Sequence, residues 1–156
     1  MSRFLKFPAT KNFNILNRPI FYYKMSSEVE KAKIAASQPK NKNEASLFTK
    51  IINREIPSDI IHEDDKCIAI MDKFPAAPVH FLVIPKKELS GINDMTEEDE
   101  PLVGHLINVG KNLAKNKNIF KDGYRIVINQ GKNGCQSVMH LHIHVIGGKQ
   151  LGWPPG

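Results

Sequence analysis

The sequence has few of the features that mark secreted or membrane-spanning proteins. Its 156 residues include only two cysteines, Cys67 and Cys135, which lie too far apart in sequence to form a CxxC pair. Two cysteines do not make a disulfide framework, so we expect a reducing compartment. No apolar run approaches the roughly 18 residues that a membrane-spanning helix needs, so we expect no membrane association.

An excess of positive charge is also missing from most of the chain. Residues 1–24 hold five basic residues and no acidic one, which leaves 17 basic and 16 acidic residues in the rest. A face that binds the backbone of a nucleic acid needs clustered lysine and arginine. We therefore expect no nucleic-acid partner.

Composition divides the chain into three segments. Residues 1–27 are a basic extension that we leave out of the fold, either disordered or targeting. Residues 28–44 hold a short helix and a polar linker, and residues 45–156 form one globular domain. This last segment is long enough to bury a continuous core, and one domain is the natural expectation for a chain of this length.

Apolar periodicity and turn residues predict the elements of this domain. Ser46 is expected to cap a helix whose apolar face includes Phe48 and Ile51. Thr96 and Asp99 resemble a capping box before a second, longer helix. The predicted strands are Asp59–Glu63, Cys67–Asp72, His80–Ile84, Tyr124–Gln130 and Met139–Ile146. Strands in hairpins, with helices between the blocks, indicate an α+β fold with an antiparallel sheet.

Three alternating histidines carry the strongest functional signal. Alternate residues of a strand share a face, so His140, His142 and His144 are expected to line one face. The apolar residues between them are expected to line the other face, against the core. A lone buried histidine is usually structural, whereas three on one face indicate a function.

Two chemistries fit such a row of imidazoles. Neutral imidazole is a common metal ligand. On a straight strand the outer pair of Cα atoms lies ~13 Å apart, and a zinc ion holds nitrogen at ~2.1 Å, which disfavours all three histidines binding one ion. The second chemistry is nucleophilic catalysis, in which a neutral imidazole attacks phosphorus and forms a phospho-histidine intermediate.

The loop before the histidines favours the second chemistry. Residues 131–137 (GKNGCQS) lead directly into the histidine strand. Glycines allow backbone N–H groups to converge on an anion, and Ser137 adds a hydroxyl three residues before His140. Taken alone, the same loop could be an ordinary hairpin connection.

At this point the chain resembles a known family. Residues 140–146 (HLHIHVI) match the His-φ-His-φ-His-φ-φ pattern (φ apolar) of the histidine-triad (HIT) superfamily. Four further segments resemble the Hint branch of this superfamily, the nucleoside phosphoramidases. They are residues 47–65 (LFTKIINREIPSDIIHEDD), 75–87 (PAAPVHFLVIPKK), 123–131 (GYRIVINQG) and 152–156 (GWPPG). The terminal WPPG separates this branch from the dinucleoside polyphosphate hydrolases and the uridylyltransferases.

The resemblance implies a fold and a reaction. The fold is a five-stranded antiparallel sheet with two main helices, and two copies join their sheets into a ten-stranded homodimer. The substrates are adenosine or guanosine 5′-phosphoramidates, with aminoacyl adenylates as a further candidate class, cleaved through a nucleotidyl-histidine to release AMP or GMP. The leaving group of a phosphoramidate is an amine. No cofactor and no metal are expected.

The resemblance also assigns roles to residues at matching positions. His142, the second histidine of the triad, would attack the α-phosphorus, flanked by His140 and His144. His80 matches a fourth histidine that supports the triad, and Ser137 matches a serine near the phosphate and leaving group. The positions that match nucleotide contacts are Asp72 for the ribose hydroxyls, Asn129, Gln136, and an apolar base slot of Phe48, Ile51, Ile70 and Leu82.

Two residues of the nucleotide site depart from the family's pattern. Cys135 stands where a glycine is usual beside the phosphate, and a positive φ there would cost about 1–2 kcal/mol. Its backbone N–H could still donate to the phosphate. Lys73 stands beside Asp72 where an apolar residue is usual, so it either disturbs the contact with base and ribose or attracts the nucleotide's charge.

Ordinary structural roles stay open for several of these residues. Asp72 could cap a turn, Asn129 could end its strand, and His80 could be a satisfied core histidine. Phe48 and Ile51, at helical spacing, could be plain core. The resemblance along the whole domain favours the functional roles.

Two rival functions and one candidate interface complete the expectations. The rivals are a dinucleoside polyphosphate hydrolase with the same intermediate, and a nucleotide-binding or scaffolding module whose catalysis is incidental. Leu106, Val109 and Leu113 could supply a helical seam between the two copies. The C-terminal tail is expected to reach toward the partner's active site and shape the choice of leaving group.

The amino-terminal extension suggests a subcellular location. Residues 1–24 are basic, free of acids and contain apolar side chains, as mitochondrial transit peptides are. The sequence after Met25 resembles the ordinary amino terminus of a cytosolic Hint protein. We therefore expect a mitochondrial full-length chain and a cytoplasmic or nuclear product begun at Met25. A disordered or misassigned extension is the alternative.

Overall fold

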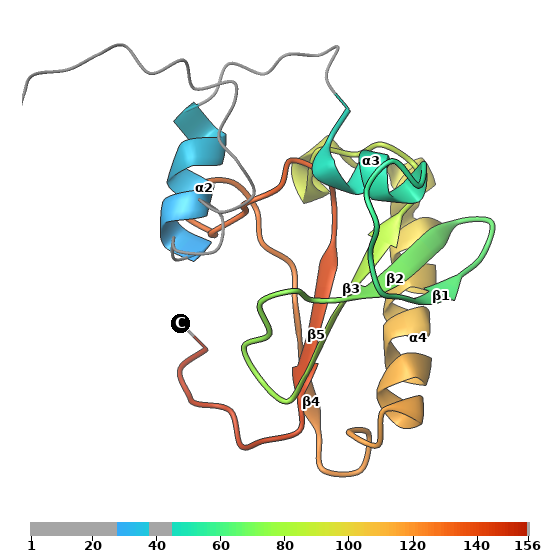
Figure 1. The fold of residues 1–156 in the computed structure, drawn as a ribbon, viewed down its shortest axis with the longest axis vertical. Helices are drawn as coiled ribbons and strands as arrows, with labels where there is room; N and C mark the ends of the chain where they lie inside the picture. Colours follow the sequence, from blue (N-terminus) through green and yellow to red (C-terminus); the bar gives the residue numbers. More distant parts are fainter. Residues whose placement is uncertain (1–27, 38–44, 156) are drawn as a thin grey trace, which may run out of the picture.

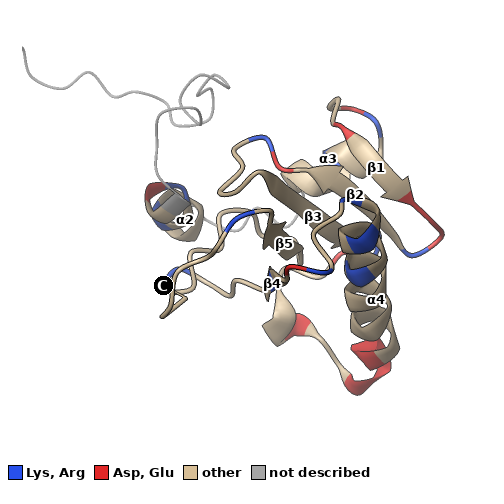
Figure 2. Cartoon of the chain, turned by 90° about the horizontal axis from the view of Figure 1, so that it is seen from below, with Lys and Arg blue, Asp and Glu red and all other residues tan. Residues whose placement is uncertain are grey.

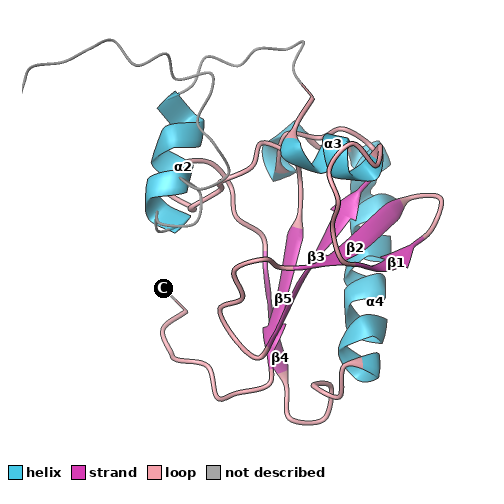
Figure 3. Ribbon diagram, in the orientation of Figure 1, coloured by secondary structure: helices cyan, strands magenta, loops and turns pink. Residues whose placement is uncertain are grey.

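The computed structural model describes residues 28–37 and 45–155, in which helices and strands alternate in blocks (Figures 1 and 3). The helices are α2 (Glu28–Ser37), α3 (Leu47–Ile52) and α4 (Glu100–Asn116), with 3₁₀ turns η2 (Ile92–Asp94) and η3 (Glu97–Asp99). The strands are β1 (Ile60–Glu63), β2 (Cys67–Met71), β3 (Val79–Pro85), β4 (Tyr124–Val127) and β5 (Ile143–Gly147). The expected short helix is present as α2. The basic extension (1–27) and the polar linker (38–44) lie outside the described residues.

The five strands form one sheet in the order β1-β2-β3-β5-β4. Every neighbouring pair in it is antiparallel. The predicted α+β class and the five-stranded antiparallel sheet are therefore confirmed. β3 and β5, far apart in sequence, lie side by side at the centre, which brings His80 and the histidine triad together.

The sheet has two different faces. On one face, Phe81 and Val83 of β3 and Val145 of β5 pack with α4 in the larger apolar cluster. On the other face, Leu82 and Ile84 pack with α3 in a smaller cluster. Figure 1 shows α4 along one side of the sheet and α3 across one end of it. Because side chains alternate along a strand, the even-numbered residues of β3, His80 among them, share the α3 side.

Helix α4 begins where the sequence predicted a capping box. Thr96 and Asp99 exchange both hydrogen bonds of that motif. Figure 2 shows acidic residues at one end of α4 and lysines toward the other, an order that complements the helix dipole. Leu106, Val109 and Leu113 are at most 7% exposed and pack against the chain's own sheet. The idea that they form a seam between two copies is therefore wrong, because their surface is already used.

Two strands, β4 and β5, are each three residues shorter than predicted. The strand expected over Met139–Ile146 begins only at Ile143, because the backbone before it bonds elsewhere: Leu141 N donates to Leu89 O at 2.6 Å. The strand expected over Tyr124–Gln130 ends at Val127. His140 and His142 therefore precede β5, while His144 lies in it.

Helix α2 packs through a small face. Ala32 is fully buried, and the Lys31 Nζ lies 4.3 Å from the centre of the Phe74 ring. The contact links α2 to the segment between β2 and β3 that leads into His80. None of the described helices has the length and apolar character needed to cross a membrane.

Candidate active site

His142 is held in the tautomer that a nucleophile needs. Its ring is 4% exposed, and its Nδ1 lies 2.7 Å from the backbone oxygen of His140. A carbonyl can only accept, so Nδ1 carries the hydrogen and donates it. In the neutral ring, Nε2 is then unprotonated and presents a lone pair.

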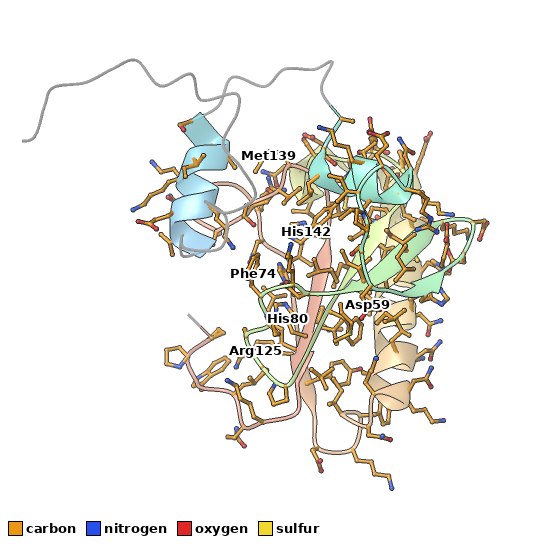
Figure 4. All side chains as sticks on the ribbon, viewed as in Figure 1. Asp59, Phe74, His80, Arg125, Met139 and His142 are labelled. Carbon is orange, nitrogen blue, oxygen red and sulfur yellow. The ribbon has the colours of Figure 1, made fainter. Side chains whose placement is uncertain are left out.

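The same reasoning sets the tautomers of His80 and His144. The backbone N–H of Ala76 donates to Nδ1 of His80 at 3.1 Å, so the hydrogen of the neutral His80 ring is on Nε2. That Nε2 lies 2.9 Å from Nδ1 of His144 and donates to it. His144 therefore carries its own hydrogen on Nε2. Figure 4 labels His80, which lies in β3, and His142, which directly precedes β5.

The hydrogen bonds from Ala76 N–H through His80 to His144 form a relay, and this relay ends in a donor that lacks an acceptor. Within the described part of the chain, Nε2 of His144 is the buried side-chain nitrogen or oxygen that has no hydrogen-bond partner. Leaving a buried donor unsatisfied costs about 1–3 kcal/mol. Burial, followed by the neighbouring His142 and His80, lowers the pKa of His144 to about 3, so its ring is neutral at physiological pH. Its ring centre lies 4.9 Å from that of His142, so a ligand at His142 would meet this N–H.

Both ring nitrogens of His140 bond to groups of the scaffold. Its Nε2 donates to Pro85 O at 2.9 Å, which leaves Nδ1 to accept from the Ser46 hydroxyl at 3.0 Å. Burial lowers the pKa of this ring, against smaller opposing effects of the Pro85 carbonyl and the Glu88 charge. The first histidine of the triad thus contributes its backbone oxygen, which orients His142.

Three of these supporting groups were not predicted from the sequence as parts of the site. They are the Ser46 hydroxyl, the Pro85 carbonyl and the Ala76 N–H. Ser46 was predicted only as a helix cap, a role confirmed by its bond from Thr49 N at 3.0 Å. It lies 94 residues from His140. Neither backbone group has a sequence signature.

Asp72 lies beside the relay. Its Oδ2 is 3.4 Å from Nε2 of His80, and its Oδ1 accepts from Phe74 N at 2.7 Å. The turn-capping role is therefore present, and the carboxylate also faces the supporting histidine. The expected contact with ribose hydroxyls stays a prediction, as does the role of Lys73, which is exposed next to it.

The glycine-rich loop is braced from inside. Gln136 is 1% exposed; its Nε2 donates to Ser90 O at 2.6 Å and Val138 O at 3.1 Å, while its Oε1 accepts from Gly131 N at 2.9 Å. The side chain predicted to contact nucleotide thus holds the loop's shape in this structure. Cys135 has a φ of 57°, so it takes the strained conformation anticipated where a glycine is usual.

The residues expected to form a base slot lie together and are closely packed. Phe48 stands edge-on to the ring of His142, with centres 5.0 Å apart. Ile51, Ile70 and Leu82 belong to the same cluster, and each is at most 6% exposed. They support the triad from the α3 side, while Asn129 and Ser137 are half-buried. Binding of nucleotide by any of these residues stays a prediction.

Comparisons with known proteins agree with this geometry. Residues 53–151 match the HIT domain. A HIT-like protein from Synechococcus elongatus is 50% identical over 114 residues, 73% of this chain and 99% of that protein. The 14 kDa zinc-binding protein of Zea mays is 44% identical over 134 residues, 85% of this chain and all of that protein.

Two solved structures are similar in fold. A HIT family hydrolase from Legionella pneumophila Philadelphia 1 has a TM-score of 0.71 and 41% identity, covering 72% of this chain and 100% of that one. A histidine triad nucleotide-binding protein from Candida albicans has a TM-score of 0.60 and 28% identity, covering 70% of this chain and 83% of that one.

Proposed function

This chain belongs to the HIT domain family, and from that premise we propose that it is a purine nucleoside phosphoramidase. The proposed substrates are adenosine and guanosine 5′-phosphoramidates. The products are AMP or GMP and an amine. The names of the Legionella and Candida proteins, a hydrolase and a nucleotide-binding protein, support the general class.

The observation that carries the proposal is the pair of opposite ring nitrogens in the site. His142 presents an unprotonated Nε2, while neighbouring His144 presents an N–H that lacks an acceptor. A phosphoryl group has an electrophilic phosphorus and oxygens that accept hydrogen bonds. It therefore satisfies both nitrogens at once.

In the first step, the lone pair of His142 Nε2 forms a bond to the α-phosphorus. The bond from phosphorus to the amine nitrogen breaks, and the amine leaves with the electron pair and takes up one proton from water. His144 Nε2–H donates to a phosphoryl oxygen as negative charge builds there. The His140 carbonyl stabilises the positive charge that develops on the His142 ring.

In the second step, water attacks the phosphorus of the nucleotidyl-histidine. The bond from phosphorus to His142 Nε2 breaks, the nucleoside monophosphate leaves, and the water's proton replaces the one consumed before. Covalent catalysis thus divides one difficult displacement into two easier ones. His142 returns to its starting tautomer because His140 O still accepts from Nδ1.

Steady-state turnover of an adenosine phosphoramidate, compared with that of a diadenosine polyphosphate, tests the assignment. We expect kcat/KM for the phosphoramidate to be higher by about tenfold or more. A reversed ratio would favour the rival hydrolase. Interaction phenotypes that survive His142→Ala would favour the scaffolding module.

The proposed chemistry uses no metal. The Zea mays relative is named a zinc-binding protein, so Asp72, His80 and His144 have to be considered as metal ligands. Their donor atoms lie within 4.8 Å of one another. Their hydrogen bonds disfavour a metal there. Nδ1 of His80 accepts from the Ala76 N–H, so the hydrogen on its Nε2 cannot move to Nδ1 and free a lone pair for an ion.

A homodimer with a ten-stranded sheet is part of the proposal. β4 lies at an edge of the sheet. Ile126 on it is 36% exposed, and Phe120 just before it is 49% exposed. An open edge with exposed apolar side chains is a template for pairing with another strand. We expect a dimer by sedimentation at micromolar concentration and a shift to monomer in Ile126→Lys; a monomeric wild type would overturn this part.

We also propose that residues 1–24 direct the full-length chain to mitochondria. The motivation is their content of five basic residues and no acid. The test fuses residues 1–30 to a fluorescent protein, with and without Met25→Leu. We expect mitochondrial signal from the Met25→Leu fusion and an added cytosolic signal without the substitution. Diffuse signal from the Met25→Leu fusion would exclude the targeting role.

A further inference from the structure

A second cluster of imidazoles and a carboxylate lies on the α4 face of the sheet, away from the triad. Nε2 of His62 and Nε2 of His105 both lie against Oδ2 of Asp64, at 3.1 and 2.8 Å. Sγ of Cys67 lies 3.6 Å from the same oxygen. Two ring nitrogens, a carboxylate oxygen and a thiol sulfur from three elements and one turn thus converge.

A β-bulge in β1 turns His62 into this cluster. Ile60 pairs with Ile70, whereas His62 pairs with Ala69, so β1 carries an extra residue between the two pairs. In a regular strand Ile60 and His62 would share a face. Here Ile60 packs in the α3-side cluster, while His62 lies opposite Ala69 of the α4-side core. Bulges commonly re-aim a side chain beside a functional site.

The carboxylate at the centre is fixed in place. Oδ1 of Asp64 accepts from the backbone N–H groups of Lys66 and Cys67, each at 2.8 Å. These bonds close the turn between β1 and β2 and leave Oδ2 facing the two imidazoles. The side chains of His62, Asp64 and His105 are between 23% and 34% exposed, so an ion can reach the cluster from solvent.

We propose that His62, Asp64, Cys67 and His105 form a binding site for a divalent transition-metal ion, zinc above all. Imidazole, carboxylate and thiolate are the ligands that zinc prefers. With bonds of about 2.0–2.3 Å to a tetrahedral ion, neighbouring donor atoms lie roughly 3.3–3.8 Å apart. The donor atoms of His62, Asp64 and Cys67 lie within 4.8 Å of one another. His105 lies outside this set, but its Nε2 is 2.8 Å from the shared oxygen, so a small shift of its side chain would bring it in as the fourth ligand.

Binding replaces hydrogens with the ion. Zinc binds cysteine as the thiolate, so the Cys67 thiol gives up its proton when the ion binds. Binding forms a bond from Sγ to the metal and releases this proton to water. In the bound state each imidazole carries its hydrogen on Nδ1, which leaves the Nε2 lone pair for the metal. Carboxylate and thiolate together balance the charge of the dication.

The site would join three parts of the fold. His62 comes from β1, Cys67 from β2 and His105 from α4. An ion there would tie the β1–β2 hairpin to the helix that covers the core. Because the triad is on the opposite face, the ion would stabilise the fold and leave the catalytic step unchanged.

Cobalt titration of the chelator-treated full chain tests the site. We expect one Co²⁺ per chain, with the absorption band of a cobalt–thiolate bond, and displacement by Zn²⁺. Cys67→Ser should remove this band, while the matched Cys135→Ser should keep it. His62→Gln and His105→Gln should weaken Zn²⁺ binding by about tenfold or more.

Other outcomes would overturn the proposal. They are absence of binding to the wild-type chain, a thiolate band that survives Cys67→Ser, and Zn²⁺ binding that is lost in His80→Gln but unchanged in His62→Gln. The last would place the ion at the triad instead. The half-exposed His62 keeps the test valid if Cys67→Ser fails to fold, as circular dichroism would show.

Discussion

Two clusters in this protein are made from the same residue types and are arranged differently. In one, the carboxylate of Asp72 lies beside a chain of hydrogen bonds that runs from the Ala76 N–H through His80 to His144 and ends in a donor lacking an acceptor. In the other, His62 and His105 both point at a single oxygen of Asp64. In a chain of hydrogen bonds, the position of the hydrogen on one ring fixes its position on the next ring. In a convergent set, several donor atoms face one point and can bind one ion.

The difference comes from the backbone around each cluster. In the first, the N–H of Ala76 forces the hydrogen of His80 onto Nε2. In the second, the β1 bulge turns His62 toward α4. Histidine and aspartate in a sequence therefore do not distinguish a catalytic relay from a metal site.

The largest expected effect comes from removing the proposed nucleophile, His142. His142→Ala should lower turnover of an adenosine phosphoramidate by roughly 10⁴-fold or more, because the covalent route is lost. The variant should still bind AMP, as measured by calorimetry, because the remaining contacts are intact. His62→Ala is the matched control and should keep wild-type turnover. If the activity of His142→Ala stayed within tenfold of the wild type, the assignment of His142 as the nucleophile would be wrong.

Breaking the relay should have a smaller effect. His80→Ala removes the donor that fixes the tautomer of His144, and we expect kcat to fall roughly 10²-fold. His80→Gln retains an N–H that can reach His144 Nδ1, so it should recover part of the loss. Equal activity of the two variants would show that hydrogen bonding to His144 does not matter.

The pH dependence of stability should separate the clusters. The folded pKa of His144, about 3, is below its ordinary 6.5, so the unfolded chain takes up a proton first as pH falls. Stability is then complete above about pH 6.5 and declines below it, by about 1 kcal/mol per pH unit. Urea unfolding at pH 7.5 and 5.5 measures this, and His144→Gln should flatten the slope. An unchanged slope in that variant would contradict the assignment.

Asp64 should contribute in a different window. Burial alone would raise its pKa, but hydrogen bonds from His62, the Cys67 and Lys66 amides and His105 together lower it below 3.8. Its stabilisation is present above pH 3.8 and is lost as pH falls further. Asp64→Asn should therefore lower the free energy of unfolding at neutral pH, and this difference from the wild type should shrink as pH falls below about 4. Urea unfolding of both proteins at pH 7 and pH 3 measures it, and an equal difference at the two pH values would contradict the assignment.

Chelation should have the smallest effect on activity. Treatment with EDTA should leave kcat unchanged, because the relay offers hydrogen bonds and not a bound ion. The melting temperature should fall by a few degrees if the α4-side cluster is loaded. If EDTA abolished activity and zinc restored it, a metal ion at the triad would be supported. The two clusters would then not differ in the way described above.

Periodicity predicted the elements well because their causes are local. The cap at Ser46, the capping box at Thr96 and the alternation along β3 each depend on residues within a few positions of one another. The five-stranded antiparallel sheet followed from them and from the family resemblance. The start of β5 was misplaced because Leu141 bonds to Leu89, a partner 52 residues earlier in the chain.

The site was predictable only in part, for the same reason. The alternating histidines pointed to His142 without any structure. The buried brace of Gln136 could not be read from its neighbours, since its acceptors include Ser90 in a distant segment. His62 and His105 carried no motif at all, because they meet through a bulge and a helix that the sequence does not bring together.

The sequence by itself determined the fold class, the family and the residue that is proposed to attack phosphorus, because each is encoded by spacing along one segment. Only the tertiary structure decided which nitrogen of each ring holds its hydrogen. Those positions depend on the carbonyls of His140 and Pro85 and the N–H of Ala76. Every residue type supplies such backbone groups, so only the folded chain shows which of them faces an imidazole.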